Sequence, residues 1–220
     1  KTFTFASEIK SIKRFSKGID TNSKILFFLL GYIPEPVTIY ENIYSFPAGC
    51  FGFLKNNKLS IKEFDKYNYE PKINKPYKEI ISDVKELFNN SIKRHLISDA
   101  PIGTFLSGGL DSSIITAVAA QYKTDLQTLS LVFDEKELSE EKYQDLIVKK
   151  YNTKHTKYLI NESLFLDNID DYFKAMEQPT IDGLNTYFVS KAAKDNGLTT
   201  VLSGVGGDEI FYGYPSFKDG

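Results

Sequence analysis

In the middle of the chain, an apolar segment, a doubled glycine and the start of a helix follow one another, and this succession constrains the fold more than any other feature. Residues 107–113 read Ser-Gly-Gly-Leu-Asp-Ser-Ser, between an expected strand at 102–106 and an expected helix at 112–122. Two glycines let the backbone turn tightly, so that N–H groups approach a ligand closely. The helix start adds unpaired N–H donors and the positive end of its dipole. The sequence therefore predicts an anion-binding loop after a strand.

The side chains of this loop indicate which anion it binds. Ser107, Ser112 and Ser113 offer hydroxyl donors, whereas Asp111 would repel a bare phosphate. We therefore assign to Asp111 a Mg²⁺ ion that bridges phosphate oxygens. No lysine follows the glycines, so this is not the G-x-x-x-x-G-K-S/T loop. The alternative is a glycine turn whose Ser and Asp side chains only cap a helix, and it leaves the second glycine and the acid unexplained.

A second glycine-rich and acidic segment follows another expected strand. Residues 202–209 read Leu-Ser-Gly-Val-Gly-Gly-Asp-Glu. We expect this loop to meet the first one across neighbouring strand ends, which would place Asp208 near Asp111 as a second Mg²⁺ ligand. The alternative is a glycine turn with acids in the first turn of the next helix.

Short apolar strands alternate with helices from residue 76 onwards, and this pattern predicts the fold class. A long amphipathic helix is expected up to about residue 97. Further helices are expected at 112–122, 140–151, 163–176 and 187–196, and strands at 102–106, 126–133, 156–160 and 200–203. The alternation predicts an α/β fold with a doubly wound, mostly parallel sheet and helices on both faces.

The first third of the chain has a different character. Helices are expected at 8–15 and 23–30, the second with Asn22 or Ser23 as its N-cap, and residues 2–5 alternate as a strand end would. A hairpin is expected at 51–64, closed by two asparagines. The connector at 66–78 is rich in Tyr, Asn, Lys and Pro. We therefore place one domain at 1–75 and a second at 76–220.

The two loops resemble those of a known family. The first is similar to the pyrophosphate-binding PP-loop of ATP pyrophosphatases, which include GMP synthetase, argininosuccinate synthetase, tRNA-modifying thiolases and asparagine synthetase. The first loop alone does not choose among them. The second, S-G-x-G-x-D-E-x-F-x-G-Y at 203–214, resembles the second nucleotide loop of glutamine-hydrolysing asparagine synthetases. Residues 4–12 and 45–49 are similar to the end of that family's glutaminase domain and to the following linker.

This resemblance assigns roles by position. It implies that residues 1–75 are the tail of a glutaminase domain with a linker, and that 76–220 are an ATP-binding synthetase domain, incomplete at its C-terminus. Asp111, Asp208 and Tyr214 are the expected catalytic residues, and the first two are the expected metal ligands. The expected ATP-binding residues are Leu106, Ser107, Gly108, Gly109, Leu110, Asp111, Ser112, Ser113, Leu131, Ser203 and Gly204, with Leu106 and Leu131 beside the adenine.

The resemblance also implies a reaction. The expected function is an ATP-dependent amidotransferase that adenylates a carboxylate, aspartate first among the candidates, and transfers ammonia from glutamine to it. The cofactors are ATP and Mg²⁺. Relatives often carry Glu where Val205 stands, which leaves open another acceptor such as a sugar acid. The sequence also leaves open a tRNA-modifying PP-loop enzyme and a nucleotide-binding pseudoenzyme. The family's catalytic lysine lies beyond Gly220, so we expect these residues alone to be inactive.

The composition of the chain indicates which kinds of binding partner and which cell compartment to expect. Lys and Arg number 27 against 29 Asp and Glu, a net charge of −2, which opposes a nucleic-acid partner. Cys50 is the only cysteine, which suits a reducing cytoplasm. No apolar run reaches membrane-spanning length, so we expect a cytoplasmic protein with small-molecule substrates and no membrane partner. A glutaminase domain is the expected intramolecular partner, and a homodimer is left open. We interpret Lys1 and Gly220 as cuts inside a longer protein.

Overall fold

The chain divides into two compact units. The computed structural model describes residues 3–66, 74–133 and 139–217. One unit comprises Lys1–Asn74 with Asp170–Gly183, and the other Lys75–Ile169 with Leu184–Gly220. Segment 170–183 thus lies with the first unit, although it follows most of the second in sequence.

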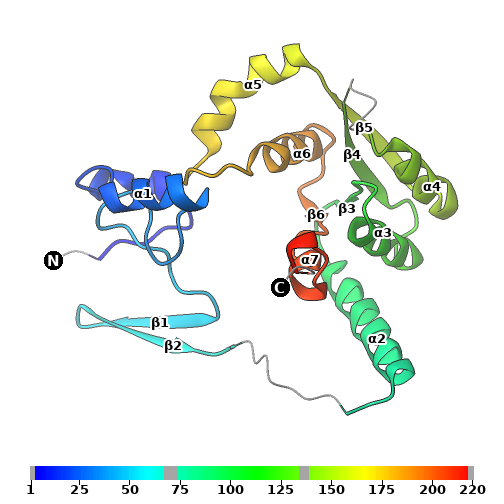
Figure 1. Ribbon diagram of the computed structural model, residues 1–220, viewed down its shortest axis with the longest axis horizontal. Coiled ribbons are helices and arrows are strands. Elements are labelled where there is room, and N and C mark those ends of the chain that lie inside the picture. The colour runs from blue at the N-terminus through cyan, green and yellow to red at the C-terminus, as the bar shows by residue number, and fades with distance from the viewer. Residues whose placement is uncertain (1–2, 67–73, 134–138, 218–220) are drawn as a thin grey trace. The chain divides into compact units, whose positions relative to one another are not determined.

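The second unit is built on a four-stranded parallel sheet (Figure 1). Its strands are β3 (Ile102–Phe105), β4 (Gln127–Phe133), β5 (Lys154–Ile160) and β6 (Thr200–Leu202). They lie in the order β5-β4-β3-β6, and every neighbouring pair is parallel. The connections on the two sides of β3 therefore run in opposite directions, which leaves a crevice at the carboxyl ends of β3 and β6. The expected fold class is confirmed.

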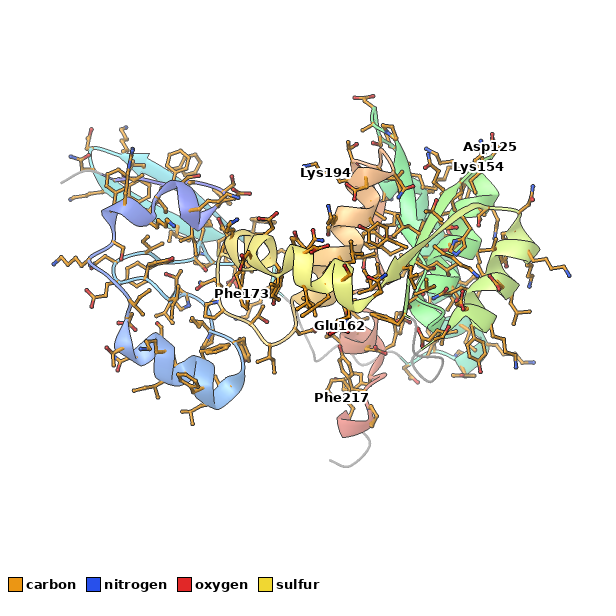
Figure 2. The ribbon with its side chains drawn as sticks, turned by 90° about the horizontal axis from the view of Figure 1, so that it is seen from above. Asp125, Lys154, Glu162, Phe173, Lys194 and Phe217 are labelled. Atoms are coloured by element: carbon orange, nitrogen blue, oxygen red, sulfur yellow. The ribbon has the colours of Figure 1, made fainter. Side chains whose placement is uncertain are left out.

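Helices cover both faces of this sheet. Helices α3 (Leu110–Tyr122) and α4 (Glu141–Tyr151) lie on one face and α6 (Leu184–Asp195) on the other (Figures 1 and 2). Helix α2 (Tyr77–His95) packs on α3. Two further helices, α5 (Glu162–Ala175) and α7 (Gly207–Phe211), follow β5 and β6.

The core beneath α3 combines apolar packing with one polar contact. Ile92, Val118, Ala119 and Leu126 form a buried cluster that joins α2, α3 and the residue before β4. On the sheet side of α3, the hydroxyls of the buried pair Thr104 and Thr116 lie 2.9 Å apart. A hydrogen bond satisfies both buried groups, so the helix is held against β3 without an unpaired polar atom.

The first unit includes helix α1 and a hairpin. In α1 (Thr21–Leu30), the Asp20 carboxylate accepts a hydrogen bond from the Ser23 N–H at 2.6 Å, so Asp20 is the N-cap instead of Asn22 or Ser23. Strands β1 (Cys50–Lys55) and β2 (Lys58–Glu63) form the expected hairpin. Asn56 and Asn57 have φ values of 51° and 59°, the left-handed conformation that a tight two-residue hairpin turn requires.

Segment 170–183 is tied to the rest of the first unit by hydrogen bonds. The Glu177 carboxylate accepts from the N–H groups of Ile9 and Lys10 at 2.6 and 3.1 Å. Gln178 Oε1 accepts from the Ile39 N–H at 2.9 Å. These bonds pair residues far apart in sequence, so no local pattern announces them.

Two local predictions were wrong. Instead of one helix at 8–15, the chain forms the short 3-10 turns η1 (Ile9–Ser11) and η2 (Lys13–Phe15). Residues 3–5 belong to no strand. The first N–H groups of the expected helix bond to Glu177, so a distant carboxylate replaces the local partners that the pattern implied. Of the described helices, none is long and apolar enough to span a membrane.

At the amino ends of β4 and β5, a histidine lies among hydroxyl groups. His155 Nδ1 and Thr153 Oγ1 lie 2.9 and 3.0 Å from Thr128 Oγ1. His155 Nε2 is buried and, within the described residues, has no hydrogen-bond partner. Burial lowers the pKa of His155 and the Lys157 ammonium lowers it further, although the Asp145 carboxylate and the Thr128 contact act in the opposite direction. At the same edge, Lys154 pairs with Asp125 at 3.5 Å (Figure 2).

We expect His155 to make stability pH-dependent. Its pKa is lower in the folded than in the unfolded state, so the folded protein favours the neutral imidazole. The free energy of unfolding is therefore unaffected by His155 above the unfolded pKa of about 6.5, and it decreases as the pH falls below that value. Thermal unfolding measured between about pH 7.5 and pH 5.5 should show a smaller loss for His155→Gln than for wild type. The matched control is His95→Gln, because His95 is exposed on α2. Equal losses in all three proteins would contradict this.

Candidate functional site

The first glycine-rich loop connects β3 to α3 and is held by its own serines. Gly108 has φ +100°, a conformation that favours glycine. The hydroxyls of Ser107 and Ser112 lie 3.0 Å apart. The Ser107 hydroxyl also accepts from the Gly109 N–H, and the Ser112 hydroxyl from the Ser107 N–H, both at 3.2 Å. Ser112 is buried, so its hydroxyl stabilises the turn from within.

Two carbonyl groups at the start of this loop are bound by side chains from other elements. Ser130 Oγ on β4 donates to the Leu106 carbonyl. Gln144 Nε2 on α4 donates to the Ser107 carbonyl at 3.0 Å. Neither side chain was predicted as part of the site, because serine in a strand and glutamine in a polar helix carry no signal of their own in the sequence.

The second loop lies against the first. It follows β6, whose Leu202 pairs with Thr104 of β3, so both loops leave the same edge of the sheet. A Cβ atom on Gly204 would lie 3.1 Å from the Ser112 N atom and 3.2 Å from Asp111 Cβ. A Cβ atom on Gly207 would overlap Asp111 Oδ2 in its present position. The absence of side chains at these glycines therefore lets the two loops meet.

The negative charges of the second loop act on Asp111 at this contact. The pKa of Asp111 is raised, first by burial and then by the negative charges of Asp208 and Glu209. A nearby cation would lower this pKa again, and carboxylate oxygens suit Mg²⁺. Within the described ranges, no three Asp, Glu, His or Cys side chains converge as a metal site. Two carboxylates would supply only part of the ligands of a cation, and the others would have to come from water or a bound anion.

The remaining predicted residues of the second loop are more exposed. The Ser203 hydroxyl accepts from the Val205 N–H at 3.3 Å. Val205 is 89% exposed, so its side chain contributes little to packing. Tyr214 donates its phenolic hydrogen to Glu209 Oε1 at 2.8 Å, which links it to the acidic group. On the first loop, Leu110 is exposed and Ser113 half-buried.

A pocket of about 400 Å³ opens beside the carboxyl ends of β4 and β5 on the α6 side. Leu131 belongs to its lining, whereas Leu106 is fully buried in the core. Polar side chains at the pocket are Asn161, Glu162 and Asn185; the apolar ones are Leu131, Phe133, Ile160, Phe165, Leu184 and Phe188. An apolar chamber with a few polar groups suits a flat ring that carries hydrogen-bonding atoms on its edge.

This geometry defines a class of protein. Two glycine-rich loops meet at adjacent parallel strand ends, one opens a helix, and carboxylates lie beside it. Such an arrangement is suited to a nucleotide phosphate chain with its metal ion. A family model described as asparagine synthase matches residues 83–220. The chain belongs to the asparagine synthase family.

Two relatives agree with this membership. A Methanocaldococcus jannaschii protein with the provisional name of a glutamine-hydrolysing asparagine synthetase is 35% identical over 99% of this chain, which spans 44% of that relative. Asparagine synthetase 1 of Bacillus subtilis is 28% identical over 98% of this chain, which spans 34% of it. Among solved structures, an ammonia-dependent NAD synthetase from Campylobacter jejuni is similar with a TM-score of 0.39 and 15% identity, covering 64% of this chain and 61% of that one.

Proposed function

We propose that this chain is the ATP-binding part of an ATP-dependent amidotransferase of the asparagine synthetase type. The observation that carries the proposal is the contact between the two loops, which gathers backbone N–H donors and the carboxylates of Asp111 and Asp208 at one edge of the sheet. Membership of the asparagine synthase family supports the same reaction class. The 220 residues span under half the length of the two named relatives. We therefore propose this activity for the full-length protein, called the full chain below, and not for these residues alone.

The proposed reaction has two steps. An oxygen of the substrate carboxylate attacks the α-phosphorus of ATP, the bond to the bridging oxygen breaks, and pyrophosphate leaves with an acyl-adenylate formed. Ammonia released from glutamine then attacks the acyl carbon, loses a proton, and displaces AMP. In the first step, negative charge develops on the leaving pyrophosphate. The N–H donors of the first loop are already positioned to stabilise that charge before the reaction begins.

The roles of the residues follow from their positions. The Gly108 N–H and the N–H groups in the first turn of α3 bind pyrophosphate oxygens, and Ser107 and Ser112 hold the backbone of the loop in place. Asp111 and Asp208 are the residues that would hold Mg²⁺. When bound, the ion supplies positive charge that offsets the charge of the phosphates. Tyr214 donates a hydrogen bond to Glu209 and orients its carboxylate beside Asp111 and Asp208.

The acceptor is the least constrained part of the proposal. Aspartate is the first candidate because the relatives are named asparagine synthetases. Val205, in the loop beside the carboxylates, offers neither charge nor an exchangeable proton, which favours another carboxylate, such as a sugar acid, as the second candidate.

The test is pyrophosphate release by the full chain with Mg-ATP, glutamine or ammonium, and a panel of carboxylates including aspartate and sugar acids. We expect release that depends on one carboxylate, together with equal amounts of AMP and amide. Binding of ATP without pyrophosphate release under every combination would instead identify a nucleotide-binding pseudoenzyme.

We further propose that the pocket lined by Leu131 receives the adenine base. Leu131→Trp places a large ring in this space, so we expect the Kd for Mg-ATP to rise at least about tenfold. The Kd for Mg-pyrophosphate should stay unchanged. The matched control is Leu159→Trp: Leu159 is exposed on the neighbouring strand and pairs with Val132, so it faces away from the pocket. If Leu131→Trp left ATP binding intact, the base would have to bind elsewhere.

A further inference from the structure

Gln144 is a buried polar residue to which the reaction described above assigns no role. It lies in the first turns of α4 and is 2% exposed. Its Nε2 group donates to the Ser107 carbonyl at 3.0 Å. Its Oε1 atom is buried and has no partner among the residues that the structure describes. The orientation of the amide is determined, because a flipped amide would set two oxygens against each other.

The bound carbonyl belongs to the peptide that contains the Gly108 N–H. This peptide is trans, so its C=O and N–H groups point in opposite directions. The hydrogen bond from Gln144 directs the Ser107 carbonyl towards α4, and the Gly108 N–H therefore points away from α4. No acceptor for this N–H is found among the described residues. A free backbone donor in a glycine turn at a helix start is available to an anion.

The start of α4 also packs closely against the same turn. A Cβ atom on Gly108 would lie 3.0 Å from Glu140 Cβ and 3.1 Å from the Glu140 carbonyl oxygen. The turn therefore leaves no room for a side chain between Gly108 and α4. An apolar side chain of the same size would fill the space and leave the peptide free to rotate.

We propose that Gln144 is a positioning residue for the first loop: its amide holds the Ser107 carbonyl so that the Gly108 N–H is presented to an oxygen of pyrophosphate. This rests on the proposed function of the loop. Gln144 acts through the backbone and touches no substrate itself. The unpaired Oε1 atom is consistent with a residue retained for its donor rather than for stability.

The first variant is Gln144→Met, which keeps the length of the side chain and removes the donor. In the full chain we expect the Kd for Mg-pyrophosphate to rise about tenfold and the Kd for adenosine to stay unchanged. The thermal midpoint should stay close to that of wild type, because the lost hydrogen bond and the removal of the unpaired oxygen offset each other. Lys149→Met, an exposed position on the same helix, is the matched control.

The second variant, Gln144→Glu, tests the donor through pH. An ionised carboxylate would repel the Ser107 carbonyl, whereas a protonated carboxyl group donates to it, and burial raises the pKa of such a group. The ratio of its pyrophosphate Kd to that of wild type should be large at about pH 8 and approach one near about pH 5.5. Because both Kd values are measured at the same pH, the effect of pyrophosphate protonation on affinity cancels in the ratio.

Three results would overturn the assignment: pyrophosphate affinity of Gln144→Met equal to wild type, equal losses of pyrophosphate and adenosine binding, or a Gln144→Glu ratio that does not change with pH. In each of these, wild type still binds pyrophosphate, so the proposed function of the loop stands. A wild-type chain that binds neither pyrophosphate nor ATP overturns the proposed function, and the assignment with it.

Discussion

Replacing Asp111 with Asn in the full chain is expected to lower carboxylate-dependent pyrophosphate release by about 100-fold or more, because the amide removes a charge that holds Mg²⁺ against the phosphates. Asp208→Asn should have a similar effect. The double variant should lose little more than either single one, since both carboxylates would serve the same ion. Initial rates measured across a range of Mg²⁺ concentrations test this, with partial recovery of the single variants at high Mg²⁺.

The same substitution should change stability in the opposite direction. The pKa of Asp111 is raised by burial and by Asp208 and Glu209, so its ionised form destabilises the metal-free fold at neutral pH. Without Mg²⁺, Asp111→Asn should therefore unfold at a higher temperature than wild type, and the difference should shrink as pH falls and the wild-type carboxyl becomes protonated. Asp125→Asn is the control, because Asp125 is an exposed residue before β4. An unfolding temperature of Asp111→Asn equal to or below that of wild type would contradict this prediction.

For the activity prediction, an Asp111→Asn variant as active as wild type would mean that Asp111 is not a metal ligand.

Replacing Gly108 with Ala should weaken Mg-ATP and Mg-pyrophosphate binding by about 10- to 100-fold. The φ value of +100° disfavours any side chain, and the added Cβ would press on Glu140 from a distance of 3.0 Å. Relief of that contact requires the loop to shift, which moves the N–H groups that face the anion. Isothermal titration with both ligands measures the effect.

The matched control for this variant is Gly197→Ala. Gly197 has φ +74° and open space around its Cβ position, so alanine there introduces the backbone strain without the contact. Both variants should lose about 1–2 kcal/mol of unfolding free energy, but only Gly108→Ala should lose affinity. Equal affinity losses in the two variants would mean that general destabilisation, and not the geometry of the loop, accounts for the result.

Much of the second unit could be predicted because its signals are local. Apolar runs bounded by turn residues indicated the four strands, and the observed ends differ from the expected ones by at most two residues. The α6 helix begins at Leu184, three residues earlier than expected.

In the first unit, the hairpin was predicted correctly since two adjacent asparagines adopt the left-handed conformation at little cost.

Non-local contacts decided what could not be predicted. Glu177 binds the backbone of Ile9 and Lys10 across more than 160 residues, and the expected helix there becomes two short turns. The membership of segment 170–183 in the first unit depends on similar bonds. Local periodicity contains no information about such partners, because they are selected only when the chain is folded.

The candidate site divides along the same line. The sequence by itself determined the chemistry of both loops: glycines that permit the turns, serines that offer hydroxyl groups, and Asp111 and Asp208 beside them, because each depends on residue type and on a strand or helix next to it. That Ser107 and Ser112 hold the first turn was found only in the structure. The expected meeting of the loops at neighbouring strand ends agrees with the pairing of β6 with β3. Only the tertiary structure decided that Asp111 packs where Gly204 and Gly207 have no side chains, and that Gln144 donates to the Ser107 carbonyl. These are contacts between distant segments, and packing in three dimensions selects them.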